Sequence, residues 1–340
     1  MKAPCAVLLS RTTITRAARA ANPSESAALQ LALPLHKGSG MKRRRPISRT
    51  IPDHASRCIE DARLEAYGVL GEIARGGMST IYLGEDRATG ERVAIKALDA
   101  FYVGHSDLVH RLLGEHELAK RARHPGLIDI RCAEQTLDGV PYLVMEYLDG
   151  ESLRALGDRR ALSRSAILAI AAQVARAVAA LHAAGIVHCD IKPDNVFVVG
   201  DASSAAPLAK VIDYGVARST SDPPLADSAI AGTPAFMAPE QWYGAPVTAS
   251  DVYALGCMLY ELLVGRPVFS GSLPQMMTAH CEHLPARPLV SCPELPPELD
   301  RLIMRMLAKE PGMRPSMTDV DAELSRLLPA DRSEDLQATG

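Results

Sequence analysis

The sequence has no marked excess of either charge and no paired cysteines. Its formal net charge is −3, which gives no electrostatic indication of a nucleic-acid-binding protein. The seven cysteines are scattered, and no two of them form a C-x-x-C pair. An odd number of cysteines without metal-ligand spacing is typical of reduced thiols. These features argue against a disulfide framework and favour a cytoplasmic protein.

Long apolar runs are also missing. No segment approaches the roughly 18 apolar residues that a membrane-spanning helix needs. The chain start superficially resembles a signal peptide, but its apolar stretch Ala6–Leu9 is shorter than the roughly 7–15 residues of a secretory segment. We therefore expect a soluble protein without a membrane span.

What is present is ordinary globular composition, with 47% hydrophobic and 23% charged residues in a chain of 340. Residues 1–66 differ from the rest, because they mix Ala, Ser, Pro and Arg without an amphipathic period, and we expect them to be disordered or loosely structured. Their basic run Lys42–Arg45 is open to two interpretations, a docking or membrane-surface patch or a solvated charge run. Met41 stands directly before this run and is an alternative start of translation.

Residues 67–147 have a strand pattern, interrupted by one helical stretch at Leu108–Ala122. Four strands are expected, at Gly68–Ala74, Thr80–Asp86, Arg92–Leu98 and Tyr142–Met145.

Beyond Gly150 the pattern becomes helical. Ser163 can cap a long helix that Gly185 closes. Its apolar face is Ile167, Ile170, Ala171, Val174, Val178 and Leu181. Further helices are expected at Asp251–Val264, Pro297–Leu307 and Thr318–Leu328. A small β-rich lobe followed by a larger helical lobe predicts a ligand cleft between them.

The segment Ile73–Ile81 (IARGGMSTI) contains small residues between two strands. Backbone N–H groups in such a loop can approach and cover phosphates. An ordinary hairpin turn has a similar composition, so this segment by itself leaves both interpretations open.

Downstream, Lys96 ends the apolar strand Val93–Lys96, and Glu115 follows 19 positions later in the expected helix. A lysine at a strand end is commonly just exposed. Paired with a helical glutamate, it becomes a candidate phosphate anchor.

The densest signal is the segment Ile186–Phe197 (IVHCDIKPDNVF). In it, Asp190 is followed by Lys192 and Asn195, and an acid, a base and an amide on one short loop can accept a hydroxyl proton, stabilise a phosphate and hold a metal. Asp213 ends a further apolar strand and is a plausible second metal ligand. Oxygen ligands of this kind suit Mg²⁺, which binds one or two side chains together with substrate phosphates.

Taken together, these motifs resemble those of the eukaryotic-type protein kinases, and most closely those of the bacterial branch. Order and spacing agree over about 260 residues. The resemblance implies an α+β, bilobal protein-kinase fold: a small β-rich N-lobe (67–145) with one major helix, a hinge (146–150) and a larger, mainly helical C-lobe (151–328), with the ATP cleft between the lobes. Residues 329–340 would be a tail.

The resemblance also implies the site residues. The catalytic residues would be Asp190, Lys192, Lys96 and Glu115. ATP would be bound by Ile73, Ala74, Arg75, Gly76, Gly77, Met78, Ser79, Thr80, Ile81, Ala94, Lys96, Met145, Glu146, Leu148 and Phe197. Asn195 and Asp213 would bind Mg²⁺, with Mn²⁺ as an alternative. Thr233, Glu240, Asp251 and Arg314 would shape the substrate-docking segment, with Glu240 paired to Arg314 and Asp251 bracing the catalytic loop.

The chain departs from the family pattern at three places. Ala74 and Ser79 replace two glycines of the phosphate-covering loop, which stiffens the loop without blocking the site. Cys189 replaces the arginine that ordinarily precedes the catalytic aspartate and binds a loop phosphate; we interpret it as a quiet buried thiol, with a reactive thiol as the alternative. The activation loop, 218–231, offers Ser219, Thr220, Ser221 and Ser228, but has Asp227 where relatives often carry a phosphorylated threonine. These changes predict that loop phosphorylation is not a strict switch.

The leading hypothesis is therefore a serine/threonine protein kinase that transfers the γ-phosphate of MgATP to protein hydroxyls and also phosphorylates itself. One alternative is a pseudokinase or nucleotide-binding scaffold, which the complete set of catalytic residues disfavours. Another is a small-molecule phosphotransferase, which the docking segment disfavours. The expected partners are protein substrates.

Overall fold

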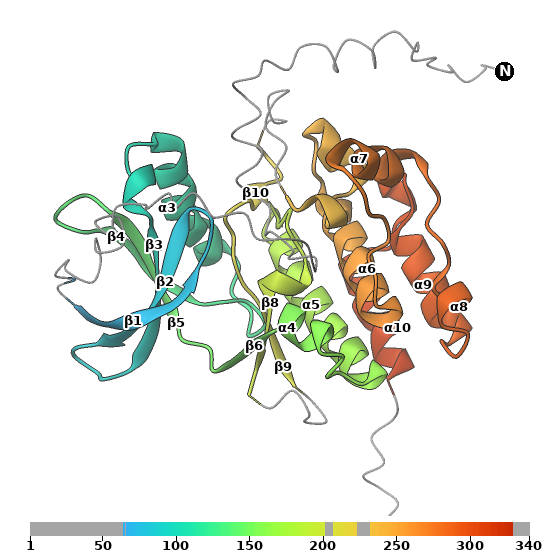
Figure 1. Ribbon diagram of the computed structural model, residues 1–340, viewed down its shortest axis with the longest axis horizontal. Coiled ribbons are helices and arrows are strands. Elements are labelled where there is room, and N and C mark those ends of the chain that lie inside the picture. The colour runs from blue at the N-terminus through green and yellow to red at the C-terminus, as the bar shows by residue number, and fades with distance from the viewer. Residues whose placement is uncertain (1–63, 65, 201–206, 223–231, 329–340) are drawn as a thin grey trace, which may run out of the picture.

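The computed structural model describes residues 64, 66–200, 207–222 and 232–328. They form a small β-rich lobe and a larger helical lobe side by side (Figure 1). This confirms the expected α+β bilobal fold. The expectations for the basic run at 42–45, for Met41, Asp227 and Ser228, and for the tail at 329–340 lie outside the described residues.

The small lobe is a five-stranded antiparallel sheet with the strand order β1-β2-β3-β5-β4. Its strands are β1 Tyr67–Arg75, β2 Ser79–Asp86, β3 Arg92–Leu98, β4 Ile130–Gln135 and β5 Pro141–Glu146. The short 3₁₀ helix η3 (Ala100–Tyr102) and helix α3 (Ser106–Arg121) connect β3 to β4. Four of these strands and the helix match the predicted elements within about two residues. Strand β4 was missed.

Side chains alternate across this sheet, so each strand serves two faces. On β5, Leu143 packs with Leu98 and with Leu112 of α3 in the main core. Tyr142 and Val144 face the other way, into a second apolar cluster. The alternation places Lys96 on the same face of β3 as Leu98, towards α3 and the helical lobe.

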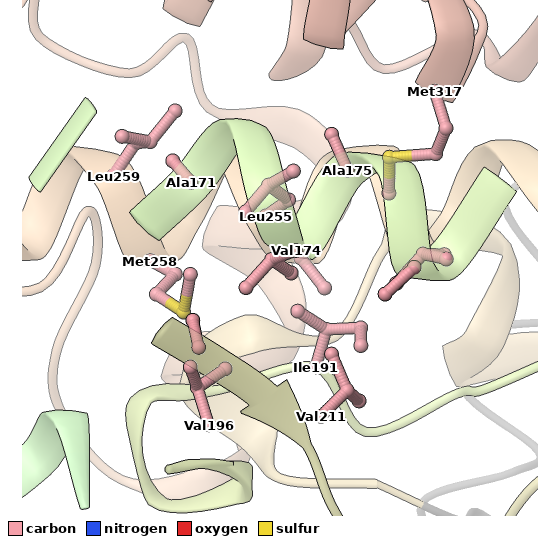
Figure 2. Packing of buried hydrophobic residues seen from close by; sticks show 14 of the residues in the cluster. Ala171, Val174, Ala175, Ile191, Val196, Val211, Leu255, Met258, Leu259 and Met317 are labelled. Carbon is pink, nitrogen blue, oxygen red and sulfur yellow. The ribbon is translucent and has the colours of Figure 1, made fainter. Parts of the chain in front are cut away.

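The helical lobe is built around α5 (Arg164–Ala183) and α6 (Thr248–Val264), whose apolar faces pack together (Figure 2). Around them lie α4 (Leu153–Asp158), α7 (Leu273–Glu282), α8 (Pro288–Ser291), α9 (Pro297–Met306) and α10 (Met317–Leu327). The sequence analysis missed α4, α7 and α8. The 3₁₀ turns η5 (Pro234–Phe236), η6 (Pro239–Tyr243) and η7 (Pro311–Met313) complete the lobe.

Helix α5 begins and ends as its sequence predicts. The Ser163 hydroxyl accepts a hydrogen bond from the backbone N–H of Ala166 at 3.2 Å. Gly185 ends the helix with φ +69°, a left-handed conformation that favours glycine. Every residue of the predicted apolar face is buried. The helix is also long and apolar enough to cross a membrane, but 61% of its most apolar window is buried within the protein, as is usual for the central helix of a folded domain.

Short strands connect the helices at the side that faces the sheet. They are β6 (Gly150–Ser152), β7 (Ile186–Val187), β8 (Val196–Val199), β9 (Leu208–Val211) and β10 (Arg218–Ser219), with η4 (Pro193–Asn195) before β8. Strand β8 lies between β6 and β9, and β7 pairs with β10. The loop between β7 and η4 and the residues after β9 therefore emerge next to each other, opposite β3.

Candidate active site

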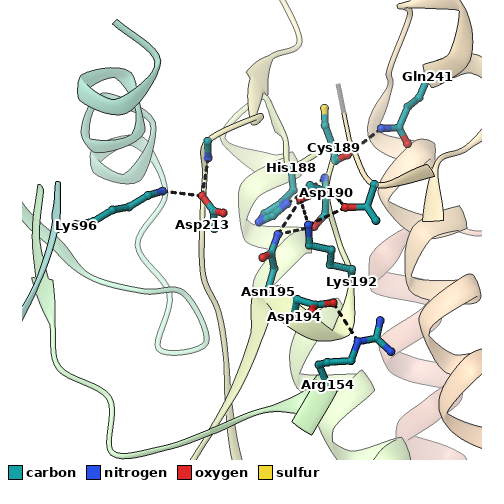
Figure 3. Close-up of polar contacts among 12 residues, drawn as sticks. Lys96, Arg154, His188, Cys189, Asp190, Lys192, Asp194, Asn195, Asp213 and Gln241 are labelled. Carbon is teal, nitrogen blue, oxygen red and sulfur yellow. Dashed lines mark hydrogen bonds and ion pairs between the residues drawn. The ribbon is translucent and has the colours of Figure 1, made fainter. Parts of the chain in front are cut away.

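Lys96 joins the two lobes. Its Nζ lies 2.8 and 2.9 Å from the two carboxylate oxygens of Glu115 on α3, and 2.9 Å from Oδ1 of Asp213, which follows β9 (Figure 3 shows the contact with Asp213). Glu115 is only 3% exposed. The structure thus forms the ion pair that the sequence suggested, and adds a second carboxylate to it.

Burial and charge act on these three groups in opposite directions. Burial alone would lower the pKa of Lys96, but the charges of Glu115 and Asp213 outweigh it and raise that pKa. Burial raises the pKa of Glu115 to about 7, although Lys96 opposes the shift. Burial would also raise the pKa of Asp213, but the charge and hydrogen bond of Lys96 lower it to about 2. Lys96 and Asp213 are therefore charged at neutral pH, while burial makes Glu115 easier to protonate than an ordinary glutamate.

Asp190 is the centre of a hydrogen-bonded group on the loop after β7 (Figure 3). Its Oδ2 accepts from Lys192 Nζ at 2.6 Å and from Asn195 Nδ2 at 3.0 Å. Its Oδ1 accepts from the Thr233 hydroxyl at 2.7 Å, and Lys192 Nζ also donates to that hydroxyl oxygen at 2.7 Å. The loop thus brings together a carboxylate, an ammonium group and an amide, and the predicted docking segment (residues 232–240) adds a hydroxyl.

The backbone before Asp190 is held in place by a side chain of helix α6. Asp251 of α6 is fully buried, and its carboxylate accepts the backbone N–H groups of His188 and Cys189 at 2.9 and 2.8 Å. His182 Nε2 of α5 lies 2.8 Å from the same carboxylate. Asp251 therefore makes the bracing contact that we expected. Burial, together with the Asp251 charge, raises the pKa of the Cys189 thiol far above its ordinary value, which favours the quiet-thiol interpretation.

Asn195 and Asp213 have free oxygens that suit a divalent cation. Asn195 uses its Nδ2 for Asp190, which leaves its side-chain oxygen available. Asp213 uses Oδ1 for Lys96 and for the backbone N–H of Gly215, which leaves Oδ2. Among the described residues, no group of three or more His, Cys, Asp or Glu side chains is placed to hold a metal ion by itself. Two oxygen ligands completed by substrate phosphates is the arrangement that Mg²⁺ prefers, so these residues fit such an ion.

The predicted phosphate-covering segment is the hairpin between β1 and β2. Gly76 N–H donates to the Ser79 carbonyl at 2.8 Å, and the residues from Ile73 to Met78 are exposed. The hairpin is tied to the end of β3, because the buried Thr80 hydroxyl donates to Asp99 Oδ1 at 2.8 Å and Asp99 N–H donates to the Met78 carbonyl at 2.9 Å.

The predicted adenine-binding residues come from both lobes. Ala94 on β3 pairs with Met145 on β5, and Ile81 on β2 pairs with Lys96. Phe197 lies on β8 in the helical lobe. Glu146 makes two contacts within the protein. Its backbone N–H donates a hydrogen bond to the Asp129 carbonyl at 3.0 Å, and its carboxylate forms an ion pair with Lys210 of β9. Leu148 follows in the connection between the lobes and packs against the main core.

The docking segment, 232–240, is fixed by a buried ion pair. Arg314 donates to both carboxylate oxygens of Glu240, at 2.6 and 2.9 Å. The side chain of Arg314 is fully buried, and its remaining N–H groups donate to the backbone carbonyls of Ala308, Ala249 and Lys309. Every donor of this guanidinium thus has a partner, as a buried charge requires.

Four contacts of the site were not foreseen. Arg154 of α4 links Asp194 of the catalytic loop to Glu261 of α6, at 3.2 and 2.7 Å. Lys210 joins β9 to Glu146, and Gln241 donates to the Cys189 carbonyl. These partners lie 40 to 107 residues apart, so no local pattern could have indicated them.

Comparison with known proteins agrees with this geometry. Residues 67–323 match the family model for the protein kinase domain. The chain is similar to serine/threonine-protein kinase Pkn1 of Myxococcus xanthus, with 38% identity over 74% of this chain and 36% of that protein. It is also similar to serine/threonine-protein kinase PknB of Mycolicibacterium smegmatis, with 35% identity over 82% of this chain and 44% of that protein. A third relative is serine/threonine-protein kinase PkaA of Streptomyces coelicolor, with 36% identity over 72% of this chain and 46% of that protein. The chain spans less than half the length of each of these relatives.

Proposed function

Because the chain belongs to the protein kinase domain family, in its bacterial serine/threonine branch, we propose that it transfers the γ-phosphate of MgATP to serine and threonine hydroxyls of proteins, itself included. The observation that carries this proposal is the position of the Asp190 carboxylate. Lys192, Asn195 and Thr233 hold it on one side of the site, while Lys96 and Asp213 meet on the side of the small lobe.

In this proposal Asp190 accepts the proton of the substrate hydroxyl, because a carboxylate within hydrogen-bonding reach of a hydroxyl can act as general base. The hydrogen bond that the Thr233 hydroxyl donates to this carboxylate, at 2.7 Å, supports such a contact with a substrate hydroxyl. Lys192 lies beside it and balances the negative charge of the transferred phosphate. Lys96, held by Glu115, anchors the nucleotide phosphates.

A divalent ion is held by the free oxygens of Asn195 and Asp213, and we propose Mg²⁺ as that ion, with Mn²⁺ as a substitute. When bound, it supplies positive charge that offsets the charge of the phosphates. The β1–β2 hairpin from Ile73 to Ile81 covers the phosphates. Ala94, Met145, Glu146, Leu148 and Phe197 surround the adenine.

Protein substrates lie along the docking segment, which Thr233 joins to the catalytic loop and which Glu240 and Arg314 fix to the helical lobe. The catalytic domain covers residues 67–328 in this proposal, with the hinge at 146–150. The cytoplasm is the compartment that fits best, because the five cysteines in the described part of the chain are free thiols.

The test is transfer of radiolabelled phosphate from ATP to generic protein substrates by the purified chain with Mg²⁺. Asp190→Asn should lower kcat by roughly 10²–10⁴-fold, which is the usual contribution of a positioned general base. Asp213→Asn should raise the Mg²⁺ concentration needed for half-maximal activity. A wild-type protein that binds MgATP but labels neither substrates nor itself would instead identify a pseudokinase.

A further inference from the structure

Cys189, the residue directly before Asp190, has an unfavourable backbone conformation. Its φ is +66°, in the left-handed region. Residues other than glycine are disfavoured in this region, because their Cβ atom comes too close to the following carbonyl oxygen. Such a conformation persists only where the surrounding structure fixes it.

Both peptide groups of Cys189 are held by other elements. Its N–H donates to the buried carboxylate of Asp251 at 2.8 Å. Its carbonyl accepts from Nε2 of Gln241 at 2.8 Å (Figure 3). Gln241 is 3% exposed and belongs to η6, immediately after the docking segment.

The orientation of the Gln241 amide is set at both ends. Its Oε1 accepts the backbone N–H of Ala238 at 3.0 Å while its Nε2 donates to Cys189. A flipped amide would place oxygen against the Cys189 carbonyl and N–H against the Ala238 N–H, and both bonds would be lost. This side chain therefore joins the docking segment to the strained residue in one fixed arrangement.

The start of the docking segment reaches the same carbonyl. Gly232 has φ +129°, and a Cβ there would lie 3.0 Å from the Cys189 carbonyl oxygen and 3.4 Å from Gln241 Nε2. The next residue, Thr233, donates to Asp190 itself at 2.7 Å. The start of the docking segment and Gln241, the residue directly after its end, thus both contact the Cys189–Asp190 pair.

We propose that Gln241 is a positioning residue that holds Cys189 in its left-handed conformation and so aims the Asp190 carboxylate at the substrate hydroxyl. This inference rests on the proposed kinase function. The inference adds that hydrogen bonds of the Gln241 amide link the substrate-docking segment to the residue that precedes the general base. A substrate seated on the segment is then aligned with the carboxylate that accepts its proton.

The test compares Gln241→Met with Gln173→Met in the full-length protein. Gln173 of α5 is a matched control, because it also donates to a backbone carbonyl (Pro207, 2.7 Å) and accepts a backbone N–H (Ala209, 3.0 Å), but it does so away from the site. Gln241→Met should lower kcat by about 10- to 100-fold, the cost of a misplaced catalytic group. The KM for ATP should change little, and Gln173→Met should lower the melting temperature but leave kcat near the wild-type value.

The second measurement repeats Gln241→Met in a Cys189→Gly background. Glycine adopts positive φ without a steric cost, so the loss of the Gln241 bond should then reduce kcat by less than about threefold. An equal loss of kcat with Cys189 and with Gly at this position would overturn the inference. So would equal kcat for the two glutamine variants in an active enzyme. A wild-type chain that transfers no phosphate would overturn the proposed function together with this inference, whereas an active one separates the two.

Discussion

Two carboxylates share the ammonium group of Lys96, and they do so from different elements. Glu115 comes from α3 of the small lobe, and Asp213 comes from the segment after β9 of the helical lobe. Asp213 has a φ of +68°, a conformation that aspartate tolerates better than most residues. The pairing therefore depends on both lobes being in place, and it reports on their relative position.

Removing Glu115 should lower activity nearly as much as removing Lys96. The two side chains act as one unit, so Glu115→Gln combined with Lys96→Met should be little worse than either single change. The measurement is kcat/KM for ATP in a double-mutant cycle. If the fold-loss of kcat/KM in the double mutant equalled the product of the two single losses, the two residues would act independently.

The raised pKa of Glu115 predicts a pH dependence. With a pKa of about 7, Glu115 is increasingly protonated as the pH falls, and its ion pair with Lys96 is lost, so activity should decline from pH 8 to pH 6. Stability should change in the opposite direction. A carboxyl whose pKa is raised on folding stabilises the fold most below its unfolded pKa of about 4.5, and this contribution is lost as the pH rises through about 7.

The control for this pH dependence is Glu115→Gln, which has no titrating group at the position. Its residual activity should vary less than the wild-type activity between pH 6 and pH 8. Profiles of the same shape for both proteins would show that another group titrates there.

At the scale of elements, the docking segment and Gln241, which directly follows it, are attached to the rest of the site at three points. Thr233 reaches Asp190, Gln241 reaches Cys189, and Glu240 reaches Arg314. The first two contacts are made with the catalytic loop, and the third is made with the residue that follows η7 in the helical lobe. These contacts fix the segment to the rest of the site.

The start of the activation loop supports a prediction about regulation. Cys189 is 4% exposed and uncharged, so it cannot bind a phosphate as an arginine would. Strand β10 is tied to β7 by backbone pairing of Arg218 with Val187. We therefore expect enzyme with Ala in place of Ser219, Thr220, Ser221 and Ser228 to keep most of its activity.

The measurement is kcat/KM on one protein substrate, for phosphatase-treated and for autophosphorylated enzyme. Autophosphorylation of these hydroxyls is compatible with the prediction as long as activity changes little. A difference beyond tenfold, about 1.4 kcal/mol of transition-state stabilisation, would establish the loop as a switch and refute this interpretation of Cys189.

At the scale of the whole molecule, the small lobe has a second apolar cluster on the sheet face that points away from Leu112. Leu64 is 3% exposed and packs in this cluster with residues such as Val93, Ile95 and Tyr142. The expected domain boundary at residue 67 leaves Leu64 outside the domain, although its burial shows that it contributes to the core of the sheet.

Leu64→Ala should therefore lower the free energy of unfolding by about 2–3 kcal/mol, at the low end for a buried leucine. Leu137→Ala is the matched control, because Leu137 is 88% exposed and its truncation should change stability by no more than about 0.5 kcal/mol. Urea denaturation of the full-length variants measures both. Equal changes in the free energy of unfolding for the two variants would show that Leu64 does not contribute to the folded core.

The sequence by itself determined the fold class and the position of most chemical groups. The catalytic loop places Asp190, Lys192 and Asn195 within six residues, so their proximity follows from local geometry. The cap at Ser163 and the apolar period of α5 likewise depend only on neighbouring residues. The short β-rich runs at β3 and β5 predicted two strands but not which residues would cover each face.

Only the tertiary structure decided how these groups are held. The bond from Gln241 to Cys189 spans 52 residues, and the link from Arg154 to Glu261 spans 107. Such contacts arise because packing of α5 against α6 fixes Asp251 beneath the catalytic loop, and Asp251 helps to hold Cys189 at a φ that its side chain disfavours. A local sequence pattern indicates which conformations are favourable for a residue. Whether an unfavourable one is maintained depends on distant partners, whose positions are set when the whole chain has folded.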